Sequence, residues 1–320
     1  MRHPLIYIPT PGSEMEFHLP SIRFAGYVGW KLIRHGKVIR ESPMQPNLLT
    51  NAGFNYLGAG NGYASGMYAG VGTGSTAPAA TDIALVAEVA TTRPFQGTTS
   101  SGYVAIGGAV TQDYHWRRII FTFLETQGNG NLTEFGTFSG PMLARQLLKD
   151  VGGIPTTIIK TSADQLQVTY EYRCYPPLND TVLNAFAISG DAITSNITIR
   201  AQNASSTWFN PLADSPSAFG GGSVHEDSTL TVRTSSSAST PNASASSQVF
   251  SVYTNGNFYI DETIKYEPGV ANFPTGIGLL KLYVYSGGNS LYQASLATKI
   301  PKTSVKRTTI VIRRSWARFP

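Results

Sequence analysis

The sequence has little cysteine, little charge and no long apolar run. Cys174 is the single cysteine, which excludes an internal disulfide framework, and we expect its thiol to be a small buried core residue. No apolar run approaches the about 18 residues of a membrane-spanning helix, and the first residues contain no apolar stretch of signal-peptide length. We therefore expect neither membrane insertion nor secretion.

The sequence also lacks the motifs of common metal, phosphate and nucleophile sites. No two of the five histidines have metal-ligand spacing, and no Gly-x-Ser-x-Gly motif is present. GVGTGSTAP at 70–78 lacks the Gly-Lys-Ser/Thr ending of a phosphate-binding loop, so we interpret it as a turn. The group His225, Glu226 and Asp227 lies in a Ser/Gly-rich segment that offers no rigid support. We predict no metal, no cofactor and no catalytic residue.

The carboxylates leave one enzymatic hypothesis open. A glycosidase needs two carboxylates on neighbouring elements, and Glu125, Glu134 and Glu171 all lie in strand-like segments. We interpret each of them as a solvent-facing strand residue opposite an apolar one. The sequence therefore favours a protein that is not an enzyme, and a hydrolase ranks third among the hypotheses.

Residues that favour strands and turns are abundant. The chain contains 32 glycines, 16 tyrosines and 15 phenylalanines together with many Ser, Thr and Asn residues, which is typical of strands joined by many turns. We predict a mainly β fold of antiparallel, sandwich-like modules, with a few short helices and an extended N-terminal arm.

Local patterns predict individual elements. Strict alternation of apolar and polar residues predicts a half-buried antiparallel strand in the segment QLQVTYEYRCY. Its apolar positions are Leu166, Val168, Tyr170, Tyr172 and Cys174. Asn255-Gly256 lies between two aromatic strand-like runs and predicts a hairpin. Helical spacing predicts one short helix within 46–60 and a second near 82–90.

Prolines indicate how the chain is divided. Because six prolines within residues 1–46 are incompatible with ladder interiors, we interpret 1–45 as an extended arm with room for one hairpin. The PPLND segment at 176–180 predicts a boundary between a β-rich module with short helices at 46–178 and a second β-rich module at 179–320. Within the second module, 213–248 has so few apolar residues that we expect a surface excursion or a flexible segment.

Positive charge gathers at the end of the chain. Residues 302–320 contain six basic residues and no acidic one, whereas 51–301 contain 12 basic and 16 acidic residues. This polarity favours assembly through complementary surfaces over nucleic-acid binding. The segment TTIVIRRSWARF alternates like a strand, so it is either the last strand of its own domain with solvated arginines or a strand that also docks on a neighbour. The expected docking residues are Arg307, Arg313, Arg314, Trp316 and Arg318.

Four stretches of the chain carry a family resemblance. They are NLLTNAGFNYL with VGTGSTAPAATDIALVAEVA, then WRRIIFTFLETQGNGNLTEFGTFSG, then ARQLLKDVGGIPTTIIKTSADQLQVTYEYRCYPP, and finally IPKTSVKRTTIVIRRSWARF. In order and spacing they resemble a widespread family of tailed-bacteriophage virion proteins, described as tail or tail-fibre-associated structural proteins. The resemblance covers about residues 46–178 and 299–319 and does not extend to 1–45 or 180–298.

The resemblance implies a non-enzymatic, multi-copy part of a virus particle, assembled in the host cytoplasm, where a lone cysteine stays reduced. The implied partners are other virion proteins of the tail, neck or portal region and further copies of the chain, and no nucleic acid is expected. The leading hypothesis is a tail-complex adaptor or fibre-like protein.

Two other functions remain open. One is a carbohydrate- or receptor-binding module for host attachment, in which Trp208 and Phe209 contact a host surface glycan, although the same two side chains would also serve as a loop anchor. The other is a capsid decoration protein.

Overall fold

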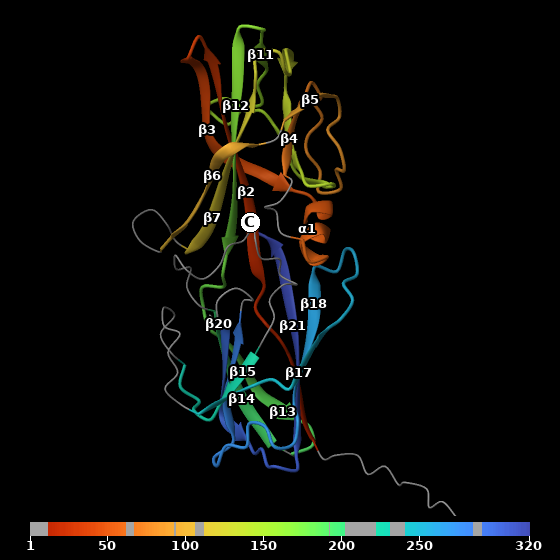
Figure 1. Ribbon diagram of the computed structural model, residues 1–320, viewed down its shortest axis with the longest axis vertical. Coiled ribbons are helices and arrows are strands. Elements are labelled where there is room, and N and C mark those ends of the chain that lie inside the picture. Colours follow the sequence, from red (N-terminus) through yellow and green to blue (C-terminus); the bar gives the residue numbers. More distant parts are fainter. Residues whose placement is uncertain are drawn as a thin grey trace, which may run out of the picture.

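The computed structural model describes residues 12–61, 67–92, 94–105, 112–191, 193–201, 222–230, 241–283 and 290–320. The described part of the chain is a mainly β fold with antiparallel sheets, as its composition predicts, and contains one helix, α1 (Asn51–Gly58). Figure 1 shows an elongated molecule with strands in both its upper and its lower half.

A large sheet of 13 strands extends through the molecule. Its main path runs through β17 (Ser247–Phe250), β18 (Tyr259–Tyr266), β21 (Arg307–Arg318), β2 (Ile22–Arg34), β3 (Lys37–Leu49), β10 (Met142–Leu147), β9 (Glu134–Phe138), β4 (Tyr68–Gly72) and β5 (Glu88–Thr92). Off this path, β1 (Gly12–His18) pairs with β21. A branch from β2 contains three more strands: β2 pairs with β12 (Asp164–Tyr175), β12 with β7 (Tyr114–Phe123), and β7 with β6 (Pro94–Val104). The strands β8 (Gly130–Leu132) and β11 (Ile158–Lys160) form a separate pair.

A six-stranded sheet forms much of the lower half in Figure 1. Its order is β13 (Thr181–Ile188), β14 (Ile193–Ala201), β20 (Ser290–Ile300), β19 (Ile277–Tyr283), β15 (Gly222–His225) and β16 (Asn242–Ser244). Glu14 of β1 and Ser189 exchange two backbone hydrogen bonds of 3.0 Å, which join this sheet to the large one. Next to this link, a side chain on Gly190 would meet the Gly12 carbonyl, and the φ of Gly190 is +83°. The link therefore requires glycine.

The strand predicted from the alternating pattern at 166–174 is confirmed as β12. The five apolar residues of the pattern, Cys174 among them, are at most 2% exposed and lie in the main core. Because β12 is paired with β2 on one edge and β7 on the other, it is a central strand and its inward face is fully covered. The expectation of a buried thiol is thus also confirmed.

The extended arm predicted at 1–45 is wrong for the residues that the structure describes, although the hairpin allowed for within it is present as β2 and β3. Residues 12–45 form β1, β2 and most of β3, which are paired strands of the large sheet, whereas 1–11 lie outside the described residues. The prolines fit because Pro20 lies between two strands and Pro43 lies at a register shift of β3 against β2. The other edge of β3 pairs with β10 only at Leu48 and Leu49. Along most of that edge, no backbone N–H group is needed for a ladder hydrogen bond.

The first predicted helix is confirmed and the second is wrong. Thr50 caps α1 by accepting a 3.0 Å hydrogen bond from Gly53 N. Residues 82–87 instead form a loop that leads into β5. The Glu134 carboxylate accepts backbone N–H bonds from Val86 and Ala87, and these tertiary contacts override the helical pattern.

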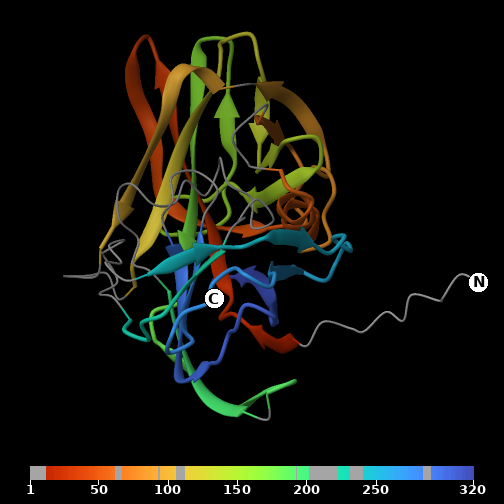
Figure 2. The same cartoon turned by 60° about the horizontal axis from the view of Figure 1, so that its bottom comes forward.

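The predicted hairpin at Asn255-Gly256 is confirmed, since β17 and β18 are antiparallel and Gly256 has a φ of +91°. The Asn55 side chain of α1 accepts hydrogen bonds of 2.8 Å from Tyr253 Oη and Gly256 N in this hairpin loop. Figures 1 and 2 accordingly both show α1 beside the C-terminal strands.

Strand pairing does not follow the predicted boundary near residue 178. The strands β17, β18 and β21 come late in the chain, yet they belong to the large sheet with β1 and β2. The predicted excursion at 213–248 contributes β15, β16 and the start of β17 through its described residues, and the rest of it lies outside them.

Candidate interaction surface

The three predicted docking arginines of β21 that precede Trp316 are ion-paired within the chain. The pairs are Arg307–Glu267 at 2.9 Å, Arg313–Asp261 at 2.8 Å and the buried pair Arg314–Glu262. All three carboxylates lie on or just after β18, the antiparallel neighbour of β21. At these positions, the basic residues near the end of the sequence therefore pair with acidic residues from the middle of the same chain.

The remaining two predicted docking residues also form contacts within the chain. Trp316 is 2% exposed and lies 5.6 Å from the ring of Tyr253. Arg318 donates hydrogen bonds to Leu49 O at 2.8 Å and to the Asn51 side chain at 2.6 Å. The buried Arg314 and Trp316 therefore fix β21 within the chain. Arg307, Arg313 and Arg318 are partly exposed, and their docking on a neighbour stays a prediction.

Trp208 and Phe209, the predicted sugar contacts, lie outside the described residues.

A different set of basic and aromatic side chains lies on the outer face of β2, β12 and β7. Its members, which we call the arginine–aromatic face, are Tyr27, Tyr114, Trp116, Arg118 and Arg173, and all of them are partly exposed. The guanidinium carbon of Arg173 lies 3.7 Å from the ring centroid of Tyr27 and 4.5 Å from that of Tyr114. The guanidinium carbon of Arg118 lies 4.9 Å from the ring of Trp116. These distances are within the range of cation–π contacts.

Glu171 holds both arginines of this face in place. It is 1% exposed and accepts hydrogen bonds from Arg118 Nη2 at 2.6 Å and from Arg173 Nε at 2.6 Å. The interpretation of Glu171 as solvent-facing is therefore wrong. Sequence alternation placed it correctly on the outer face, but only the pairing of β12 with β7 brings Arg118 directly opposite.

A groove of about 550 Å³ continues the arginine–aromatic face toward β3. Gly29, Ile120 and Thr169 form part of its floor, and Arg118 lines both the groove and the face. A side chain on Gly29 would lie 3.0 Å from the sulfur of Met44, so glycine allows β3 to bulge at this point.

The other two glycosidase candidates both form contacts within the chain. Glu134 is fully buried and paired with Arg145 at 2.9 Å, so its interpretation as solvent-facing is also wrong. Glu125 is partly exposed and accepts a 2.8 Å hydrogen bond from Gln165.

The histidine of the 225–227 group is buried. His225 Nε2 lies 2.9 Å from Ser223 Oγ, and burial lowers the pKa of the imidazole to about 4. Across the described ranges, no group of three or more His, Cys, Asp or Glu side chains is arranged to hold a metal ion. Nor does the described part of the chain contain a helix with the length and hydropathy to cross a membrane.

Comparison with known proteins identified no relative: no family model matches the chain, and neither the curated proteins nor the solved structures gave a match.

Proposed function

We propose that this chain is a non-enzymatic structural component of a tailed-bacteriophage virion, a tail-complex adaptor or fibre-like protein that binds other virion proteins. The arginine–aromatic face is the observation that carries the proposal. Tyr, Trp and Arg are the residue types that dominate the binding energy of protein interfaces, and here five of them lie together on one open sheet face.

Preorganisation makes this face suited to binding. Glu171 and the neighbouring rings already fix Arg118 and Arg173, so an incoming partner orders few additional side chains. The buried Tyr175 stacks on the partly exposed Phe319 with ring centroids 3.9 Å apart and lies 5.3 Å from the ring of Tyr114, so the aromatic cluster continues beyond Tyr114 to Phe319.

The charge of the face indicates the chemistry of the partner. Arg118 and Arg173 share one carboxylate, that of Glu171, and the exposed Arg23 lies opposite Tyr175 in the neighbouring strand. The face therefore carries excess positive charge and complements an acidic surface with apolar patches. The sequence resemblance to tailed-phage virion proteins and the elongated shape in Figure 1 support a partner within the same particle.

Incorporation into particles tests the proposal. The source phage is propagated with Trp116→Ala supplied in place of the natural chain, and the protein content of purified particles is measured by quantitative mass spectrometry. Loss of a central aromatic contact costs about 2 kcal/mol or more, a factor of about thirty in affinity, so the variant is expected to be depleted from particles.

Val252→Ala is the matched truncation control, because Val252 is 93% exposed in the loop between β17 and β18. It is expected to incorporate normally. Absence of the natural chain from purified particles would reject the virion assignment. Normal incorporation of a correctly folded Trp116→Ala variant would reject the role of this face.

A further inference from the structure

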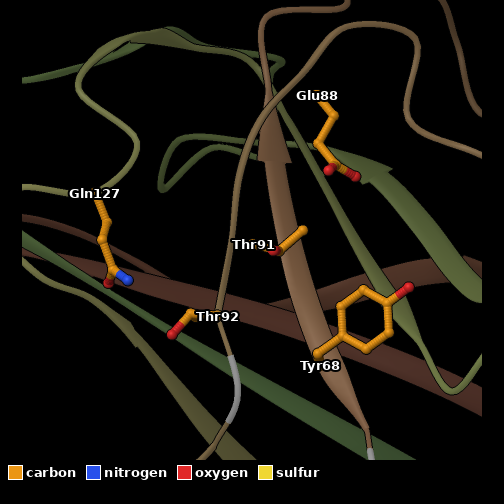
Figure 3. A pocket seen from close by; sticks show the side chains of 5 residues that line it. All are labelled: Tyr68, Glu88, Thr91, Thr92 and Gln127. Carbon is orange, nitrogen blue, oxygen red and sulfur yellow. The ribbon is translucent and has the colours of Figure 1, made fainter.

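A polar pocket of about 590 Å³ lies between the large sheet and the turn that follows β7. It is lined by Tyr68 of β4, by Glu88, Thr91 and Thr92 of β5, and by Gln127. Figure 3 shows Glu88, Thr91 and Tyr68 on one side of the β5 backbone and Thr92 and Gln127 on the other, so the pocket extends around this edge strand. Its volume lies within the about 300–1,000 Å³ of small-molecule sites. The pocket shares no residue with the arginine–aromatic face.

Two of the lining side chains are held in fixed positions. The ring of Tyr68 stacks on Phe138 with centroids 5.0 Å apart and an interplanar angle of 10°. The side-chain oxygen of Gln127 accepts a 3.0 Å hydrogen bond from Leu124 N. Because that oxygen is engaged, the Gln127 amide presents its NH₂ group as a donor.

Glu88 supplies a carboxylate as an acceptor. It is exposed, and none of the ion pairs among the described residues involves it. The hydroxyl groups of Thr91 and Thr92 add further polar contacts, and the Thr92 hydroxyl is oriented by a 3.1 Å hydrogen bond to Thr122 O.

This combination of groups suits a ligand with several neutral hydroxyl groups. A carboxylate accepts hydrogen bonds from adjacent hydroxyls, an amide donates to them, and an aromatic ring packs against the C–H surface of a sugar. Glu88 disfavours an anionic ligand, and the hydroxyl and amide groups disfavour a purely apolar one. A cationic ligand would pair with Glu88. Its N–H groups, however, are donors and would offer no acceptor to the amide NH₂ of Gln127.

We infer that this pocket binds a neutral saccharide unit, with Glu88 and Gln127 as the hydrogen-bonding residues and Tyr68 as the wall. The inference does not depend on the arginine–aromatic face or on the presence of the chain in a virion. It places a glycan contact at positions distinct from Trp208 and Phe209.

Ligand-observed NMR on the full chain tests the inference. The probes are the methyl glycosides of neutral hexoses and of N-acetylhexosamines, each titrated to tens of millimolar, with methylammonium chloride as the cationic probe. At least one glycoside is expected to show saturation transfer, and methylammonium is not.

Two isosteric variants locate the binding. Glu88→Gln removes the charged acceptor, and Gln127→Glu removes the donor while keeping an oxygen for Leu124 N. Each is expected to weaken glycoside binding about tenfold or more, the effect of losing one hydrogen bond to a charged or well-oriented group. Glu41→Gln, which changes an exposed carboxylate on β3, is the control and is expected to bind like the natural chain.

Three outcomes would overturn the inference: no transfer to any glycoside, glycoside binding that both pocket variants leave unchanged, or binding of methylammonium alone. Incorporation of Glu88→Gln into particles, measured as for Trp116→Ala, separates this result from the proposed function. A variant that has lost the glycoside but is incorporated normally supports the pocket and leaves the interface proposal standing.

Discussion

Arg145 of β10 and Glu134 of β9 form an ion pair that is removed from water, with Arg145 Nε 2.9 Å from Glu134 Oε2 and the two side chains 1% and 0% exposed. Arg145 also contacts Asp82 at 2.8 Å and the Thr76 carbonyl at 2.8 Å. Glu134 accepts a further hydrogen bond from Gly74 N. This pair therefore organises the loop between β4 and β5, which leads directly to Glu88 at the start of β5.

Removing one member of this pair leaves a buried charge without its partner. We expect Arg145→Met to lower the free energy of unfolding by about 3–5 kcal/mol. The double variant Arg145→Met with Glu134→Gln is expected to lose less than the sum of the two single changes, because neither charge is then left alone. Urea denaturation followed by fluorescence measures all three values. Additive losses would show that the two side chains do not act as a pair.

Asp164 predicts a loss of stability in acid. Its carboxylate is buried and accepts a 2.7 Å hydrogen bond from Arg34 Nε, and this contact, with others from Thr161, holds the pKa of the carboxyl well below its usual range. Since the unfolded chain binds this proton more readily, the contribution is complete above about pH 4 and is lost as the pH falls toward the folded-state pKa.

The measurement is the urea midpoint at a series of pH values from 6 to 2. The natural chain is expected to lose stability more steeply below about pH 4 than Asp164→Asn, which has no carboxyl to protonate at this position. Parallel curves for the two proteins would assign the acid sensitivity to other carboxylates.

The thiol of Cys174 is expected to be inert in the folded protein. It is 2% exposed, and burial raises its pKa well above the ordinary value, so both access and the thiolate fraction are reduced. Reaction with a chromogenic disulfide reagent at pH 8 should be about a hundredfold slower than in denaturant. Rapid reaction without denaturant would show that β12 is not a central, covered strand.

Arg313 and Asp261 allow a charge-swap test of how β21 is held. The two side chains form paired hydrogen bonds of 2.8 Å across β18 and β21 and are about one-third exposed. We expect Arg313→Glu alone to lower the free energy of unfolding by about 1 kcal/mol, and the addition of Asp261→Arg to restore part of it. No restoration in thermal or urea unfolding would mean that Arg313 contributes little to the intramolecular contact.

Features encoded in adjacent residues were predictable from the sequence. The alternation at 166–174, the Asn255-Gly256 turn and the capped helix after Thr50 each depend on a pattern shorter than one element. The second helix failed because its segment is held by Glu134, about 50 residues further along the chain.

The candidate surfaces could not be derived in the same way. Arg173 and Tyr114 meet only because β12 pairs with β7, and alternation does not specify which strands become neighbours. The same limit hid the partners of β21: its basic residues have no acidic neighbour in sequence, but β18 and Glu267 directly after it supply acidic partners.

The pairing of β21 with β1 and β2 sets the order of events during synthesis. β1 lies near the start of the chain, and the strand it pairs with along its full length is translated almost 300 residues later. The nascent chain therefore emerges from the ribosome with β1 and the first residues of β2 lacking this neighbour, and their ladder closes only after β21 has been synthesised. A product of interrupted translation presents an open strand edge, which makes it a substrate for chaperones and proteases.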